Sequence, residues 1–385
     1  MVNLSKGASR IYGEAAFEVL AKAQELERQK KSILHFEIGE PDIETPKNII
    51  RAGIRAIQEK KTHYTPSIGI MELRKVIQDE VEKTRGYRPD LKQVVITPGL
   101  KPGIFFSMLA IVDPGDEVIY QDPGYPTYGS VAAFLGAQQV MVPLLEENEF
   151  RMSPDDIRDR ITKKTKLIVV NSPQNPTGSV MTKSEMEEIA ELAEQHDIYL
   201  VSDEIYSKMT YDTHHYSPTV RDAAKERTVL LDGFSKYYAM TGWRLGYMVV
   251  PHAMAERLKD FLVSAVSCTA AFTQWAGIEA LTGDQSFIPE MMARFKEKRD
   301  RIVEGLNSVP GFRCQVPKGA FYAFPNIKGT GMTSQECADH LLNKAGVASL
   351  PGTAFGPYGE GYLRFSYATT LKNIDSAIER IKRSM

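Results

Sequence analysis

The sequence predicts an α/β protein with a large domain, built on a mostly parallel sheet covered by helices on both faces, and a smaller α+β domain. A length of 385 residues exceeds what one compact core usually holds. Between about residues 94 and 250, short apolar runs alternate with segments of helical periodicity, which is typical of an α/β sheet. Beyond residue 285 the pattern changes to a long charged helix followed by short strands. This change indicates the second domain.

We expect the two domains to divide the chain unequally. The large domain should span residues 46–284, and the small domain should combine residues 1–45 with residues 285–385. The chain shows neither an internal repeat nor a low-complexity linker, so the two domains should lie tightly against each other.

The N-terminal segment should form a charged amphipathic helix over residues 14–31. Its expected buried side consists of Phe17, Leu20, Ala21 and Gln24. No apolar run follows a basic segment there, which excludes an ordinary signal peptide.

The strands of the large domain are predicted from runs that are almost continuously apolar. They lie at residues 94–97, 118–120, 167–171, 198–203 and 228–231. Because such strands carry apolar side chains on both faces, helices should cover both sides of the sheet. One of these helices begins with Thr182 and Glu185 in capping-box spacing. Its expected buried stripe consists of Met186, Ile189, Ala190 and Ala193.

The small domain is predicted from the last hundred residues. Its expected elements are a charged helix over residues 289–306, strands at 312–316, 320–324 and 362–367, and a helix after residue 372.

Composition excludes several classes of function. The 47 basic and 49 acidic residues give a formal net charge of -2 without a basic block, so neither a nucleic acid nor a membrane surface is an expected partner. No stretch is long and apolar enough to span a bilayer, and a soluble, cytoplasmic protein is expected.

The three cysteines are widely spaced and fit neither a disulfide framework nor a zinc site. His214 and His215 should lie in a surface loop, and no metal site is expected.

Polar residues follow three of the predicted strands. Asn175 comes after residues 167–171, Asp203 ends its own strand, and Lys236 follows residues 228–231. In an open α/β sheet, ligands bind beyond the carboxyl ends of the strands. Each residue alone has an ordinary explanation, as a turn residue, a helix cap or a solvated charge. Together they indicate a binding site.

Six blocks of sequence resemble class I/II pyridoxal-phosphate-dependent aminotransferases of fold type I, in that family's order. They are residues 39–42 (GEPD), 64–74 (YTPSIGIMELR), 171–178 (NSPQNPTG), 202–206 (SDEIY), 235–247 (SKYYAMTGWRLGY) and 364–368 (RFSYA). The resemblance covers nearly the whole chain. It implies an enzyme that uses pyridoxal 5'-phosphate.

The resemblance assigns roles to the residues at the ends of the strands. Lys236 would form a Schiff base with the cofactor aldehyde and shuttle the substrate's proton. Asp203 would keep the pyridine nitrogen protonated, which the cofactor needs as an electron sink. Asn175 and Tyr206 would bind the ring oxygen, and Tyr125 would stack on the ring.

The cofactor phosphate needs fixed donors, and a helix N-terminus supplies free backbone N–H groups. A helix is expected to begin near Pro102, so Gly99, Leu100 and Lys101 should bind the phosphate through the main chain. The matched positions add Arg244 and Ser235. In relatives, the tyrosine that matches Tyr64 reaches the phosphate from the other subunit, which implies a homodimer with shared active sites.

The substrate carboxylate requires a bidentate guanidinium, and Arg364 stands in the matching motif, with Asn175 and the backbone of Gly39 beside it.

Three positions depart from common family patterns. Gly233 stands where many relatives have a phosphate-binding serine, and Tyr125 replaces a tryptophan common in dicarboxylate-specific members. Lys101 matches a lysine that binds a second substrate carboxylate in one aspartate aminotransferase subgroup, which favours an acidic substrate. Glu14, however, stands where that subgroup has serine. If Glu14 lines the pocket, the preferred donor is neutral, aromatic or basic.

The expected reaction transfers the α-amino group of an L-amino acid to a 2-oxo acid by a ping-pong mechanism. A different reaction on the same scaffold, such as β-elimination (a C–S lyase), γ-replacement or cyclisation, shares the same cofactor residues and stays open. A DNA-binding regulator built on this domain would need a further N-terminal module, for which the matched region leaves no space. The sequence names neither the donor nor the acceptor.

Overall fold

The computed structural model describes residues 4–221 and 225–385. Its centre is a seven-stranded sheet of β2 (Val94–Thr97), β3 (Glu117–Asp122), β4 (Gln138–Pro143), β5 (Thr165–Asn171), β6 (Tyr199–Asp203), β7 (Thr228–Gly233) and β8 (Gly246–Val249). The strand order is β2-β8-β7-β6-β5-β3-β4, and only β8 runs antiparallel to its neighbours. The predicted α/β fold with a mostly parallel sheet is confirmed.

Successive residues of the central strands belong to two different cores. In β5, Leu167 packs with α4 (Lys101–Ile111), α5 (Thr127–Leu135) and α8 (His252–Val266), whereas Ile168 packs with α7 (Lys183–Gln195) on the opposite face. Toward β2 that opposite face is covered by α3 (Met71–Arg85) and α9 (Ala271–Thr282). Two further helices, α2 (Lys47–Gln58) and α6 (Pro154–Arg158), pack against α9 and α7. Helices therefore cover both faces, as the apolar strands predict.

Helix α7 shows how local sequence and packing agree. The Thr182 side chain accepts a hydrogen bond from the Glu185 amide, and the Glu185 side chain accepts one from the Thr182 amide, which completes the capping box. Met186 and Ile189 are almost fully buried against the sheet. Each such side chain contributes roughly 1.5–3 kcal/mol on burial. The predicted helix and its buried stripe are confirmed.

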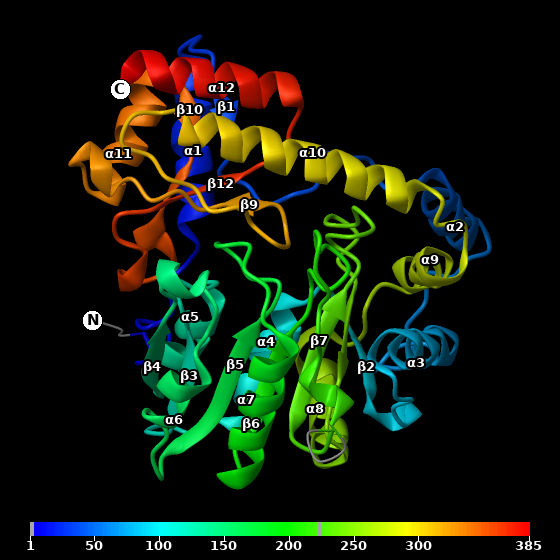
Figure 1. Cartoon of the computed structure of the whole chain (residues 1–385). Coiled ribbons are helices and arrows are strands. Elements are labelled where there is room, and N and C mark those ends of the chain that lie inside the picture. Colours follow the sequence, from blue (N-terminus) through cyan, green and yellow to red (C-terminus); the bar gives the residue numbers. More distant parts are fainter. Residues whose placement is uncertain (1–3, 222–224) are drawn as a thin grey trace.

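A second part of the chain lies above the carboxyl ends of the strands (Figure 1). It contains α10 (Phe287–Asn307), α11 (Ser334–His340), α12 (Leu371–Ser384) and an antiparallel sheet in the order β11 (Leu350–Pro351), β12 (Leu363–Ser366), β9 (Tyr322–Ala323). The N-terminal segment joins this part, because β1 (Leu34–His35) pairs in parallel with β10 (Val347–Ala348), and α1 (Ala15–Arg28) packs beside them. These helices and strands, which we call the closing elements, thus lie over the edge of the sheet where the polar residues Asn175, Asp203 and Lys236 are located.

The buried side of α1 differs from the predicted one. Val19, Ala23 and Leu26 face the small part, whereas Phe17 is 60% exposed. Ala21 and Gln24 are also exposed, so the predicted stripe was wrong. The apolar residues of α1 are not confined to one side of the helix, so they admit more than one stripe, and here the pairing of β1 with β10 decides which side is covered.

Residues 312–316 do not form the predicted strand. Only Arg313 makes an isolated bridge, to Asn326. The Asn307 side chain accepts a hydrogen bond from the Cys314 amide at 2.7 Å and donates one to its carbonyl at 3.0 Å. These backbone groups are therefore satisfied by a side chain and not by a strand ladder.

The surface location expected for the histidine pair is wrong for His215. Its ring is buried, and Nε2 lies 2.9 Å from Oε2 of the buried Glu204. Arg85 also contacts Glu204 and bridges it to Asp232 at 2.6 Å. Burial alone would raise the pKa of Glu204, but His215 and Arg85 lower it to about 2. This network fixes the residue that follows β6.

None of the helices within residues 4–221 and 225–385 combines the length and apolar content needed to cross a bilayer.

Candidate active site

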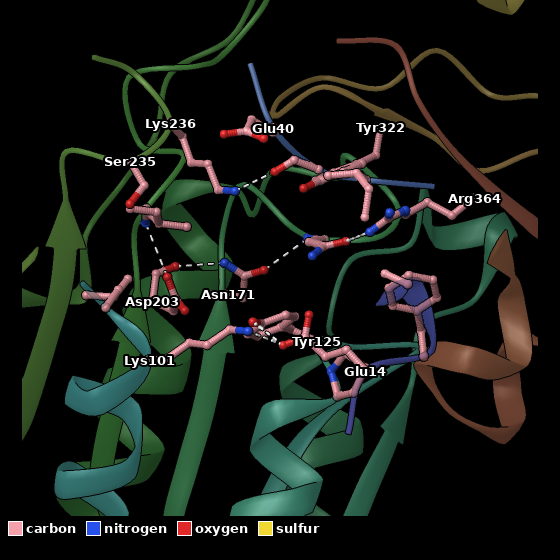
Figure 2. A pocket seen from close by; sticks show the side chains of 18 of the residues that line it. Glu14, Glu40, Lys101, Tyr125, Asn171, Asp203, Ser235, Lys236, Tyr322 and Arg364 are labelled. Atoms are coloured by element: carbon pink, nitrogen blue, oxygen red, sulfur yellow. Dashed lines mark hydrogen bonds and ion pairs between the residues drawn. The ribbon is translucent and has the colours of Figure 1, made fainter. Parts of the chain in front are cut away.

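A pocket of about 480 Å³ lies at the carboxyl ends of β5, β6 and β7, below the closing elements (Figure 2). Gly99 and Tyr64 are the two candidate residues that do not line it. The candidates that do are Glu14, Gly39, Leu100, Lys101, Tyr125, Asn175, Asp203, Tyr206, Ser235, Lys236, Arg244 and Arg364. One cavity therefore brings together residues from both parts of the chain.

Lys236 projects into this cavity from the turn after β7. Its Nζ donates a hydrogen bond to the carbonyl oxygen of Gly39 at 2.6 Å. Burial lowers the pKa of Lys236 to about 8; Glu40 opposes this shift and Arg364 adds to it. An amine with such a pKa is neutral in a substantial fraction near physiological pH. It can therefore act as a nucleophile or as a proton acceptor.

Asp203 is the last residue of β6 and is buried. Its Oδ2 accepts a hydrogen bond from the Tyr128 hydroxyl at 2.8 Å, and its Oδ1 accepts one from the Ile205 amide at 3.2 Å. Burial raises the pKa of Asp203 to about 6, and these two hydrogen bonds limit the rise. The carboxylate is thus a fixed anion at neutral pH, suited to a cationic group in the cavity.

Arg364 lies on β12 with its guanidinium between two aromatic rings. The guanidinium carbon is 4.6 Å from the ring centre of Tyr322 and 5.0 Å from that of Phe355. Nη1 donates to Asn175 Oδ1 at 3.3 Å and Nη2 to the Glu37 carbonyl, whereas the buried Nε has no partner within the described part of the chain. A buried guanidinium with an unused donor suits a carboxylate ligand.

The N-terminus of α4 forms the opposite end of the cavity. Gly99, before this helix, has φ +83°, and a Cβ there would lie 2.2 Å from Arg244 Nη2. Arg244 itself has φ 53°, and its Nη1 donates to the Thr241 carbonyl at 2.7 Å. Free amide groups of a first helical turn beside a guanidinium make a site for an anion such as phosphate. Glycine suits this position because the backbone has a positive φ, and a side chain would also displace the Arg244 guanidinium.

Glu14 faces the cavity from the residue before α1 (Figure 2). Its Oε1 accepts a hydrogen bond from the Tyr125 hydroxyl at 2.8 Å and forms an ion pair with Lys101. The Lys101 charge is therefore balanced from within the chain. Glu14 does line the pocket, which is the condition set by the sequence for a non-acidic donor.

These groups match pyridoxal phosphate part by part. The helix N-terminus with Arg244 suits the phosphate, Asp203 suits a protonated ring nitrogen, and the Lys236 amine suits the aldehyde. Tyr206 and Asn175 bring a hydroxyl and an amide for the ring oxygen. The donor set of this cavity therefore fits the cofactor.

Tyr64 is a candidate residue that does not contribute to this cavity. It is 88% exposed and lies outside the pocket of its own chain. That position agrees with a contact to a second subunit, which stays a prediction.

Comparison with known proteins decides the family. A sequence model described as "Aminotransferase class I and II" matches residues 31–381. The chain belongs to this family. It is accordingly an aminotransferase that uses pyridoxal phosphate, as the sequence blocks indicate.

Individual relatives agree with this assignment. An aspartate aminotransferase of Pyrococcus horikoshii is 40% identical over 370 residues, which cover 96% of this chain and 93% of the relative. An aromatic-amino-acid aminotransferase of Thermococcus litoralis is 38% identical over 368 residues, or 94% of each chain. The solved structure of aspartate aminotransferase from Thermus thermophilus with maleate matches all of both chains, with 37% identity and a TM-score of 0.96.

Proposed function

We propose that this aminotransferase works through Lys236, with an L-amino acid as donor and a 2-oxo acid as acceptor in two half-reactions. The observation that carries the proposal is the position of the Lys236 amine, in one pocket with a buried carboxylate at Asp203 and a buried guanidinium at Arg364. Borohydride treatment of the protein with its cofactor should tether the cofactor to Lys236 alone. Peptide mapping checks this result, and attachment at another lysine would contradict it.

The residues that would hold the cofactor follow from the fit. Leu100 and Lys101 would bind the phosphate with backbone N–H groups, and Arg244 and Ser235 would add side-chain donors. The amide of Gly99, the third residue expected from the sequence, instead donates to the Thr97 carbonyl at 2.9 Å. Asp203 would face the ring nitrogen, Asn175 and Tyr206 the ring oxygen, and Tyr125 one face of the ring. Gly233 leaves the phosphate without the hydroxyl that a serine would offer.

The chemistry divides between the cofactor and the chain. When bound, the cofactor draws off the negative charge that develops on substrate Cα, provided that its ring nitrogen stays protonated. Arg364 would bind the substrate α-carboxylate, with Asn175 and the backbone of Gly39 beside it. The Lys236 amine, freed by the incoming substrate, would accept the proton from Cα and deliver it to C4′ of the cofactor. Asp203 keeps its negative charge opposite the ring nitrogen throughout.

The donor is proposed to be neutral, aromatic or basic. Glu14 places an anion in the pocket and already pairs with Lys101, so a second substrate carboxylate would meet repulsion and find the lysine occupied. Aspartate is the competing candidate, because the side chain of Lys101 is partly exposed and relatives bear the name aspartate aminotransferase. Binding of aspartate would require Glu14 to release Lys101.

Rates with a panel of amino acids test the donor class. We expect kcat/KM for a neutral, aromatic or basic amino acid to exceed that for aspartate. In Glu14→Gln, kcat/KM for aspartate should rise by about tenfold, since the repelling charge is gone and Lys101 is released. Glu18→Gln, in the first turn of α1 and outside the pocket, is the matched control and should change neither value. A clear wild-type preference for aspartate would refute this assignment.

The active unit is proposed to be a homodimer in which Tyr64 serves the neighbouring subunit's phosphate site. Support comes from its exposure and from a groove of about 890 Å³ that adjoins the pocket at Arg244. The exposed side chains of Ile54 and Ile57 line this groove. An apolar surface of this kind suits burial against a second copy.

Hybrid dimers test the sharing of residues. Tyr64→Ala and Lys236→Ala homodimers should each be impaired. A hybrid of the two should regain one intact site, which combines Lys236 of one chain with Tyr64 of the other. Coexpression with two affinity tags and activity measurement of the doubly tagged protein check this. If Tyr64 serves its own chain, the hybrid gains no activity. A protein that sediments at the 43.1 kDa of one chain would also contradict the proposal.

Two further proposals concern organisation and location. The division into residues 46–284 and residues 1–45 with 285–385 is supported by the start of α2 at Lys47 and of α10 at Phe287, although residues 1–3 and 222–224 lie outside the described residues. A cytoplasmic location is supported by the three free cysteines. Limited proteolysis would test the division, and cell fractionation would test the location.

A further inference from the structure

Tyr322 lies where the cofactor side and the substrate side of the pocket meet. It stands on β9, paired with Ser366 of the neighbouring strand β12. Because Ser366 and Arg364 are two residues apart on β12, Tyr322 and Arg364 share one face of the small sheet. The side chain is buried, and it lines the pocket (Figure 2).

The hydroxyl of Tyr322 contacts the tyrosine that would bind the cofactor. The Tyr322 and Tyr206 oxygens are 2.7 Å apart, so one hydroxyl donates to the other. Burial raises the pKa of both phenols, so both keep their protons at neutral pH. A phenol has a single proton to donate. If Tyr206 directs its proton to the cofactor's ring oxygen, then Tyr322 must be the donor between the two tyrosines.

The ring of Tyr322 contacts the arginine that would bind the substrate. It lies 4.6 Å from the Arg364 guanidinium carbon, within the range of a cation–π interaction. The same side chain excludes any residue but glycine at position 39, where a Cβ would lie 2.1 Å from the Tyr322 hydroxyl. The Gly39 carbonyl in turn accepts the hydrogen bond from Lys236. One tyrosine therefore contacts groups on three sides of the reaction site.

We propose that Tyr322 is a positioning residue that couples the cofactor-binding hydroxyl of Tyr206 to the carboxylate-binding guanidinium of Arg364. The inference rests on the roles proposed above for those two residues. The Tyr322 hydroxyl donates to Tyr206 and so polarises the proton that Tyr206 gives to the ring oxygen. The Tyr322 ring holds the Arg364 guanidinium in the plane that a carboxylate requires. Hydroxyl and ring thus serve different partners and can be removed separately.

The Tyr322→Phe variant removes only the hydroxyl. The ring oxygen of the bound cofactor can accept a hydrogen bond from Tyr206 or interact with the proton whose loss changes the visible absorption band. A weaker hydrogen bond from Tyr206 leaves that proton more strongly held. Its loss, and with it the change of the band, then occurs at higher pH. We expect the midpoint to rise by about half to one pH unit, a three- to tenfold change in the equilibrium. Affinity for hydrocinnamate, a monocarboxylate without an amino group, should stay within about twofold because the ring remains.

Tyr211→Phe is the matched control. Tyr211 belongs to the same buried cluster and donates its hydroxyl to the Ala320 carbonyl at 2.8 Å, away from the pocket. Its loss costs a buried hydrogen bond but should leave the absorption midpoint and the hydrocinnamate affinity unchanged. An equal shift in both variants would show a purely structural effect and would overturn the proposal.

Two further measurements complete the test. Tyr322→Leu also removes the ring, and hydrocinnamate should then bind about three- to tenfold more weakly. In a Tyr206→Phe background, Tyr322→Phe should no longer move the midpoint, because its effect passes through Tyr206. A wild-type protein that acquires no cofactor band would overturn the proposed function together with this inference. A wild-type protein with the band, and a midpoint unmoved in Tyr322→Phe, would overturn the inference alone.

Discussion

Replacement of Lys236 by alanine is expected to lower kcat by roughly a thousandfold or more, because both the nucleophilic amine and the carrier of the Cα proton are lost. The cofactor should still bind without a covalent bond, since the α4 N-terminus, Arg244 and Asp203 are untouched. Borohydride should then fail to tether it. Steady-state rates and the absorption spectrum of the purified variant provide the measurement.

Chemical rescue separates lost chemistry from lost structure in this variant. The alanine leaves space for a small primary amine, which can take the place of the lysine amine at the same position. Added methylamine should therefore restore part of the rate in Lys236→Ala. Lys318→Ala is the control, because Lys318 lies at the surface in an ion pair with Glu149, and its turnover should stay within about twofold of wild type. Full activity of Lys236→Ala without added amine would exclude the proposed role.

The position of Lys236, Asp203 and Asn175 could be predicted from sequence because the rule behind it is geometric. Parallel strands end at a common edge, so residues that follow buried apolar runs are brought together whatever their separation along the chain. Arg364 and Gly39 required the family resemblance, since they come from short strands with little apolar periodicity. Their convergence on the edge depends on how the closing elements fold back.

Two tyrosines of the site could not be found in the same way. Tyr128 and Tyr322 occur in largely apolar segments, where an aromatic residue is most simply explained as core. Both are in fact buried in hydrophobic clusters. Only the hydroxyl distinguishes them from phenylalanine in function, and its partner comes from a distant part of the chain: Asp203 for Tyr128, Tyr206 for Tyr322. The one local signal is the spacing of Tyr125 and Tyr128, three residues apart where α5 begins, which brings their ring centres within 5.7 Å of each other.

The buried side of α1 could not be predicted from the sequence either. The apolar residues of the helix lie on more than one side, and its orientation follows from the β1–β10 pairing, which joins residues more than 300 positions apart. The same pairing fixes the entry of Glu14 into the pocket. The segment around Glu14 lies outside the six matching blocks, so no family motif fixes its position.

Asp203→Asn is expected to lower kcat by about a hundredfold to a thousandfold while keeping the shape of the side chain. A neutral amide cannot hold the ring nitrogen protonated, so the cofactor would draw less charge from Cα. Asp203→Glu retains the charge and should keep more activity than Asp203→Asn, even though the added methylene must fit a buried site. Single-turnover rates with a saturating donor measure the effect, and thermal unfolding establishes that each variant folds.

The pH dependence of cofactor binding provides an independent test of the Asp203 charge. The pKa of Asp203 is raised to about 6, so its carboxylate is ionised above that pH and loses its charge as the pH falls through it. Affinity for the cofactor should therefore decline below about pH 6. Tyr128→Phe removes a hydrogen bond that favours the ionised form, so the decline should begin at higher pH in that variant. The cofactor's own titrations are common to both proteins and cancel in the comparison.

Tyr120→Phe, which loses a hydrogen bond to Gln139 at 2.7 Å, should leave the pH profile of cofactor affinity unchanged. Identical profiles for wild type and Tyr128→Phe, or full activity of Asp203→Asn, would mean that this carboxylate does not govern the ring nitrogen.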